Sequence, residues 1–195
     1  MAHGSSGIAA GLLSARSILH EPVSTPVLNA FEHERRHFRR DLLRWPNLQH
    51  DAPHYMTGWC AGPAGFGMAR LLALRSDDAV IHSQRDKVLA DLEDALAAAN
   101  TCAHAADHHA CCGDAGTVMF LAMAARQLGR EDLAQASRAI AEGVLGYFRE
   151  HGLWRMQGGF HDRVVMPGLL SGQVSIGMSF LSAIDSSTTE HLALC

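Results

Sequence analysis

The stretch Ala61-Gly62-Pro63-Ala64-Gly65-Phe66 places a glycine turn directly before an apolar segment. The same arrangement, a glycine followed by two residues, a small residue and an apolar stretch, occurs three more times: His3-Gly4-Ser5-Ser6-Gly7-Ile8, Cys112-Gly113-Asp114-Ala115-Gly116-Thr117 and Ser171-Gly172-Gln173-Val174-Ser175-Ile176. The first glycines, at positions 4, 62, 113 and 172, lie 58, 51 and 59 residues apart. Periods near 50 residues are typical of repeat architectures, so we expect a chain of repeated units.

Helical periodicity extends to both sides of each glycine turn. The segments that begin at the turns are short and apolar nearly all round, as helices buried on both sides are; they cover about 7–19, 64–75, 115–128 and 173–184. The longer stretches between them are more polar and place apolar residues at helical spacing; they cover 27–42, 79–99 and 131–149. This alternation predicts an all-α fold of two concentric layers, a partial α/α toroid.

Three cysteines lie at two of the turns, Cys60 at one and Cys111 and Cys112 at the other. Because every inner helix of a toroid would start at the same end of the ring, we expect these thiols to lie close together. Zn²⁺ readily takes thiolate sulfur in a tetrahedral site, and a catalytic zinc site keeps one position open. Helix N-termini also lower the pKa of a nearby thiol. The trio therefore predicts a zinc site.

A closed structural zinc site is the alternative reading of the same cysteines. Its fourth ligand would be one of four residues: Cys102, His104, His108 or His109. Sequence spacing alone does not separate this site from a catalytic one, because both use several thiolates.

Composition excludes several classes of protein. A chain of 195 residues with 48% hydrophobic content can form one domain with a sizeable core. The net charge of −4 and the lack of a basic stripe argue against a nucleic-acid partner. No apolar run approaches the ~20 residues of a membrane span, and we identify no signal peptide.

Five cysteines fit a disulfide framework poorly, so we expect a cytoplasmic protein. The basic run 35–40 is interpreted as a solvated helix face.

Five motifs follow one another along the chain: Ala2-His3-Gly4-Ser5-Ser6-Gly7-Ile8-Ala9, Phe31-Glu32 with Arg44-Trp45-Pro46-Asn47-Leu48, Trp59-Cys60-Ala61-Gly62-Pro63-Ala64-Gly65, His109-Ala110-Cys111-Cys112-Gly113, and Gly168-Leu169-Leu170-Ser171-Gly172 with Ile176-Gly177. In this order they resemble the cyclase domain of the lanthionine synthetase C-like family, in the C-terminal half of the class II bifunctional enzymes. Cys111-Cys112-Gly113 resembles the variant in which a second Cys replaces the zinc His. On this resemblance, residues 1–195 are a fragment of about three and a half of seven repeats, without the upstream half-barrel and the dehydratase domain.

The resemblance implies zinc-dependent lanthionine ring formation. A cysteine thiolate of a ribosomal precursor (lanthipeptide) peptide adds to dehydroalanine or dehydrobutyrine in the same peptide. Cys60, Cys111 and Cys112 would be the zinc ligands, and His3 would be the catalytic acid or base near the metal. The missing half of the cyclase and a dehydratase are further implied partners.

The alternative is a non-catalytic, zinc-stabilised helical repeat that binds peptide or complements another subunit. An α/α-barrel carbohydrate enzyme would need paired acidic residues at the inner-helix ends, where only Asp114 lies.

Overall fold

The computed structural model describes residues 4–19, 22–48, 55, 57–102, 107–156 and 167–185. Throughout these residues the regular structure is helical, apart from two isolated β-bridges. The helices are α1 (Ser5–Leu19), α2 (Ser24–His37), α3 (Pro63–Arg75), α4 (Ala79–Ser83), α5 (Arg85–Cys102), α6 (Asp114–Leu128), α7 (Glu131–His151) and α8 (Gln173–Ile184). None of these helices is both long and apolar enough to cross a membrane.

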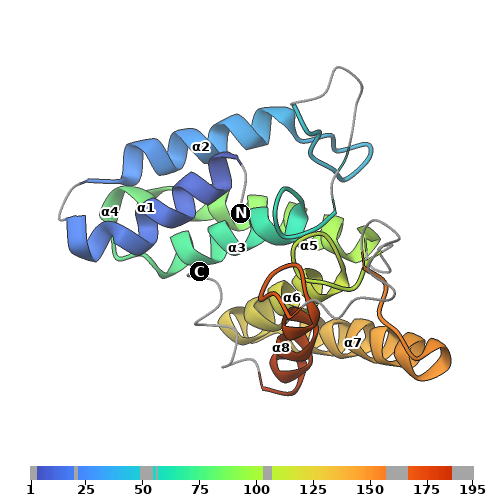
Figure 1. Ribbon diagram of the computed structural model, residues 1–195. Coiled ribbons are helices and arrows are strands. Elements are labelled where there is room, and N and C mark those ends of the chain that lie inside the picture. Colours follow the sequence, from blue (N-terminus) through green and yellow to red (C-terminus); the bar gives the residue numbers. More distant parts are fainter. Residues whose placement is uncertain are drawn as a thin grey trace.

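The helices that begin at glycine turns form one layer, and α2, α5 and α7 cover it. In the first layer α3 packs against both α1 and α6, and α6 packs against α8. In the second layer α2 lies along α1, α5 along α3 and α7 along α6 (Figure 1). The prediction of an all-α fold is confirmed, and the order of these contacts agrees with a partial α/α toroid.

The middle of the first layer forms the centre of the core. Every residue of α6 from position 114 to 125 is buried, as its apolar sequence predicts for a helix with neighbours all round. In the outer helix α7, buried residues follow one face, which includes Leu133, Ile140 and Val144. Burial of each large apolar side chain stabilises the fold by roughly 1.5–3 kcal/mol.

The expected helix 27–42 ends earlier than its periodicity predicts. α2 stops at His37, and Phe38 adopts extended backbone angles of φ −67° and ψ 122°. The chain then turns back, so that the Trp45 ring lies 4.3 Å from the Phe38 ring and Trp45 Nε1 donates to the Glu34 carbonyl at 3.0 Å. The helix therefore ends because of a contact made eleven residues beyond Glu34 in sequence, which local propensity does not encode.

A buried arginine joins four of the helices. Arg70 of α3 is 1% exposed, so its charge must be compensated inside the protein. Its guanidinium contacts the Glu34 carboxylate of α2, donates to Ser6 Oγ of α1 at 3.0 Å and lies 3.4 Å from the Asp91 carboxylate of α5. The guanidinium also lies 4.0 Å from the Phe31 ring centroid.

Arg35, the first member of the basic run, belongs to the same network. Its Nε and Nη2 atoms donate to the two carboxylate oxygens of Asp91, at 2.8 and 2.9 Å. The interpretation of the whole run as a solvated face is therefore wrong at this position. It holds for Arg36, whose side chain is 72% exposed; the Arg40 side chain is also solvated, at 74% exposed, but it lies beyond the end of α2.

Replacing Arg70 by Met should strongly destabilise the fold. The change leaves Glu34 buried without its arginine and weakens the compensation of Asp91, and loss of one partner of a buried ion pair costs about 3–5 kcal/mol. Urea denaturation followed by circular dichroism measures the loss. The control is Arg130→Met, because Arg130 pairs with Glu93 and Asp132 at the surface, where such pairs contribute under about 1 kcal/mol. Equal, small losses in both variants would contradict a structural role for Arg70.

Candidate metal centre

Two glycine turns interlock through their backbones. The Cys60 N–H donates to the Cys111 carbonyl at 3.0 Å, which ties the turn before α3 to the turn before α6. Gly58 is buried against the second turn, and a Cβ added there would overlap the Cys112 Cα and the Cys111 carbonyl oxygen. Only a residue without a side chain allows this close approach of the two turns.

A third turn supports the cysteine pair from the other side. The Cys111 N–H donates to the Leu170 carbonyl at 2.9 Å. The Ala110 N–H donates to Ser175 Oγ at 3.0 Å, and this hydroxyl in turn donates to the Gly172 carbonyl at 2.7 Å. The turn that carries Cys111 and Cys112 is therefore fixed to α8 as well as to the Cys60 turn.

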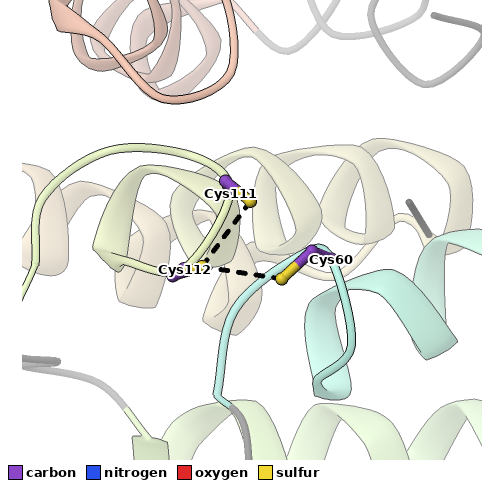
Figure 2. A group of neighbouring side chains, drawn as sticks. All are labelled: Cys60, Cys111 and Cys112. Carbon is purple, nitrogen blue, oxygen red and sulfur yellow. Dashed lines mark hydrogen bonds between the residues drawn. The ribbon is translucent and has the colours of Figure 1, made fainter. Parts of the chain in front are cut away.

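The three cysteine sulfurs converge, as expected from the toroid (Figure 2). Cys112 Sγ lies 3.6 Å from Cys60 Sγ and 3.5 Å from Cys111 Sγ, and all three sulfurs lie within 4.8 Å of one another. These distances exclude disulfides, whose sulfurs lie about 2.05 Å apart. A tetrahedral zinc with Zn–S bonds of about 2.3 Å holds its sulfurs about 3.8 Å apart, so the donor set fits such an ion.

Two thiols of the cluster have raised pKa values. The pKa of the Cys112 thiol is raised, first by its hydrogen bond with Cys111, then by Cys60 and by burial. The pKa of Cys111 is also raised: its hydrogen bond with Cys112 lowers it, but the interaction with Cys60 and burial outweigh that effect. The direction is opposite to that expected from helix N-termini, because three thiols in one place disfavour each other's thiolates. A bound cation reverses this preference.

The candidates for a fourth ligand do not join the cluster within the described part of the chain. Cys102, His108 and His109 place no ligand atom within 4.8 Å of all three sulfurs. Instead, His109 Nδ1 accepts the Cys112 N–H at 3.4 Å and so shapes the cysteine turn. His104 lies outside the described residues, and so does His3, the predicted acid or base.

His108 has a structural position beside the cluster. Its backbone N–H donates to the Arg155 carbonyl at 2.9 Å, and its ring Nδ1 accepts the Arg155 N–H at 3.1 Å. The ring is buried against Tyr147 and Trp154. Burial, together with the nearby Arg155 charge, lowers the pKa of His108 from 6.5 to about 4.

Sequence reasoning missed Gly58 and Ser175, which act on the cysteines through the backbone. Gly58 precedes Cys60 by two residues and lies outside the repeated glycine pattern. Ser175 occupies the small position of the last repeat, where glycine or serine is expected for packing alone. Neither role has a local signal, because each depends on a turn from another repeat.

Replacing Gly58 by Ala should impair metal binding. The added methyl group would push the Cys112 turn away from Cys60, and loss of such support around a metal site weakens affinity by about 10–100-fold. Competition with a chromogenic zinc chelator measures the affinity. The control is Gly146→Ala on the exposed face of α7, where nothing lies within 4 Å of the added carbon. Unchanged affinity in Gly58→Ala would show that the two turns need not interlock to bind metal.

The stability of the fold should fall in mild acid because of His108. Between pH 6.5 and about 4 the unfolded chain binds a proton that the folded His108 does not, so stability is full above pH 6.5 and declines as the pH falls through this window. The decline from this residue is at most about 3 kcal/mol. Denaturation series at several pH values test this expectation. His108→Gln should flatten the pH dependence, and exposed His82→Gln should not; identical profiles for both would contradict the assignment.

The sequence matches the family model described as lanthionine synthetase C-like protein over residues 1–194, a range that includes all three cysteines. No curated protein matches the chain.

Proposed function

The chain belongs to the lanthionine synthetase C-like family, and from this premise we propose that it binds zinc and forms thioether rings in a ribosomal precursor peptide. The observation that carries the proposal is the convergence of Cys60, Cys111 and Cys112 from two turns of a helical repeat. Three thiols with converging sulfurs are a donor set that suits a thiophilic cation such as Zn²⁺.

The donor set favours zinc over harder metals. Thiolate sulfur suits Zn²⁺, whereas Mg²⁺ and Ca²⁺ take oxygen ligands. Cys60 is buried, whereas Cys111 and Cys112 are half-buried, so we expect a peptide thiol to approach from the side of Cys111 and Cys112. When bound, zinc would supply the charge that keeps an incoming substrate thiol deprotonated at neutral pH.

The three cysteine thiolates determine the net charge of the proposed zinc site. Three thiolates contribute −3 against the +2 of the ion, which leaves a net charge of −1. This excess should keep an incoming substrate sulfur electron-rich and therefore nucleophilic. The Cys60 N–H donates to the Cys111 carbonyl, and this backbone hydrogen bond holds the turn of Cys60 beside the turn of Cys111 and Cys112.

The proposed reaction breaks the S–H bond of the substrate thiol and a carbon–carbon π bond, and it forms a C–S bond and a C–H bond. The thiol proton passes to water before the sulfur attacks. The substrate sulfur adds to the β-carbon of dehydroalanine or dehydrobutyrine, and the carbon–carbon π electrons move toward the neighbouring carbonyl as an enolate. The α-carbon then takes a proton, which completes the thioether. We propose His3 as the acid that delivers this proton, because histidine titrates in the required range.

Single cysteine variants test the metal site. Wild-type chain should hold about one zinc per molecule, and Cys60→Ala, Cys111→Ala and Cys112→Ala should each hold less. Metal analysis after exhaustive dialysis gives the content. The matched control is Cys102→Ala, which removes a buried cysteine outside the cluster and should retain zinc. Full zinc retention in Cys111→Ala would refute the assignment.

The same variants test the reaction. The probe is a synthetic peptide with one dehydroalanine and one cysteine, and mass spectrometry after thiol alkylation shows how much cysteine remains unreacted. Zinc-loaded wild type and Cys102→Ala should consume the thiol faster than Cys111→Ala does. If zinc binds as expected but thiol loss is equal in all samples, the site is structural and the proposed reaction is wrong for this chain.

A further inference from the structure

The cysteine cluster offers three sulfur donors that no fourth protein donor joins among the described residues. Cys112 Sγ lies 3.6 Å from Cys60 Sγ and 3.5 Å from Cys111 Sγ, and the sulfurs of Cys60 and Cys111 also lie within 4.8 Å of each other. A tetrahedral ion must therefore take its fourth ligand from elsewhere. A ligand that forms only three bonds would be satisfied by the cluster alone.

Two of the distances between the sulfurs also favour a three-bonded ligand. Sulfurs on tetrahedral zinc lie about 3.8 Å apart, because the Zn–S bond is about 2.3 Å long. Both distances from Cys112 Sγ, to Cys60 Sγ and to Cys111 Sγ, are shorter than this. An atom with pyramidal geometry has narrower bond angles than a tetrahedral ion, so at a similar bond length it holds three sulfurs closer together.

Trivalent arsenic has the required bonding. It is a soft centre that prefers thiol sulfur to oxygen, as soft metals do. It forms three bonds in a pyramid, and a lone pair takes the fourth position. We propose that the cluster binds trivalent arsenic, supplied as arsenous acid, through the sulfurs of Cys60, Cys111 and Cys112. The product is electrically neutral, because three thiolates balance the charge of +3 on arsenic.

The binding reaction is three successive exchanges that need no oxidant or reductant. In each exchange an S–H bond and an As–O bond break, and an As–S bond forms. The thiol proton leaves with the hydroxyl group as water, so three waters are released for each arsenic bound. Arsenic remains trivalent throughout, and no further reactant is consumed.

The structure also sets the order of these exchanges. Cys111 and Cys112 are half-buried, whereas Cys60 is buried, so we expect the two neighbouring thiols to react first and Cys60 to close the third bond. The turns are already held in place, because the Cys60 N–H donates to the Cys111 carbonyl at 3.0 Å and the Cys111 N–H donates to the Leu170 carbonyl at 2.9 Å. Such preorganisation reduces the entropy that binding costs.

This inference does not rest on the proposed ring formation. It requires only that the three thiols are reduced and lie together in the folded protein. If the same sulfurs also bind zinc, arsenic would occupy the position of the metal and block the proposed reaction. Binding itself is measured without zinc and without a peptide substrate.

Mass spectrometry under non-denaturing conditions tests the binding. Metal-free protein is mixed with arsenous acid in buffer that contains a phosphine reductant and no added thiol, and the excess is then removed by gel filtration. Wild type should retain one arsenic, with the mass of the atom less three hydrogens. The control is Cys102→Ala, which removes a buried cysteine outside the cluster and should retain arsenic with the same mass change.

Single variants of the cluster show how many sulfurs take part. Cys60→Ala, Cys111→Ala and Cys112→Ala should each lose arsenic on gel filtration or retain a two-thiol adduct, whose mass change is one water larger because a hydroxyl group remains on arsenic. Phenylarsine oxide, which needs only two thiols, should still bind Cys60→Ala through Cys111 and Cys112. Its retention, with an unchanged circular dichroism spectrum, shows that the variant is folded.

Three results would overturn the proposal. They are a wild type that retains no arsenic, a wild type with the mass of a two-thiol adduct, and Cys60→Ala with the mass of a three-thiol adduct. The outcome is separate from that of the zinc experiment. A wild type that retains arsenic but not zinc would contradict the proposed function alone, and one that retains zinc but not arsenic would contradict this inference alone.

Discussion

The hydrogen bond from the Cys60 N–H to the Cys111 carbonyl, made possible by the bare Cα of Gly58, is the constraint on which the site depends. It joins two turns that are separated by about fifty residues in sequence. Because α3 and α6 both begin at these turns, the same bond sets the relative register of the two inner helices. The distance of 3.6 Å between Cys60 Sγ and Cys112 Sγ depends on this bond, whereas the distance of 3.5 Å between Cys111 Sγ and Cys112 Sγ joins neighbouring residues of one turn.

The fold contains two clusters of ionisable groups, one around Arg70 and one around Cys112, which differ in how their charges are balanced. Around Arg70 the chain supplies both signs, so Glu34 and Asp91 are compensated inside the core. Around Cys112 the chain gathers three thiols, and their mutual interactions together with burial raise the pKa values of Cys111 and Cys112. The first cluster balances opposite charges and joins the helix layers, although Arg70 Nε has no hydrogen-bond partner, whereas the second is a donor set that could hold a metal ion.

Sequence patterns predicted the features that depend on local residue spacing. They did not predict features that depend on contacts with residues far away in the sequence. The helix starts at the glycine turns and the continuous burial of α6 follow from composition and periodicity. The early end of α2 does not, because Trp45 folds back on it. The pairing of Arg35 with Asp91 was missed for the same reason: the carboxylate lies on another helix, 56 residues away. His108 was a candidate ligand by sequence, and its buried pairing with Arg155 gives it a structural role instead.

By itself, the sequence determined the all-α class, the repeat of about fifty residues and the identity of the three thiols, because these are properties of residue type and spacing along one chain. The tertiary structure alone decided that those thiols lie within 4.8 Å of one another and that none of the neighbouring candidates among the described residues joins them. It also decided which faces of α1 and α8 remain exposed. Convergence and exposure depend on how repeats stack, and stacking is set by contacts such as Gly67 against Phe120 that link residues far apart in the chain.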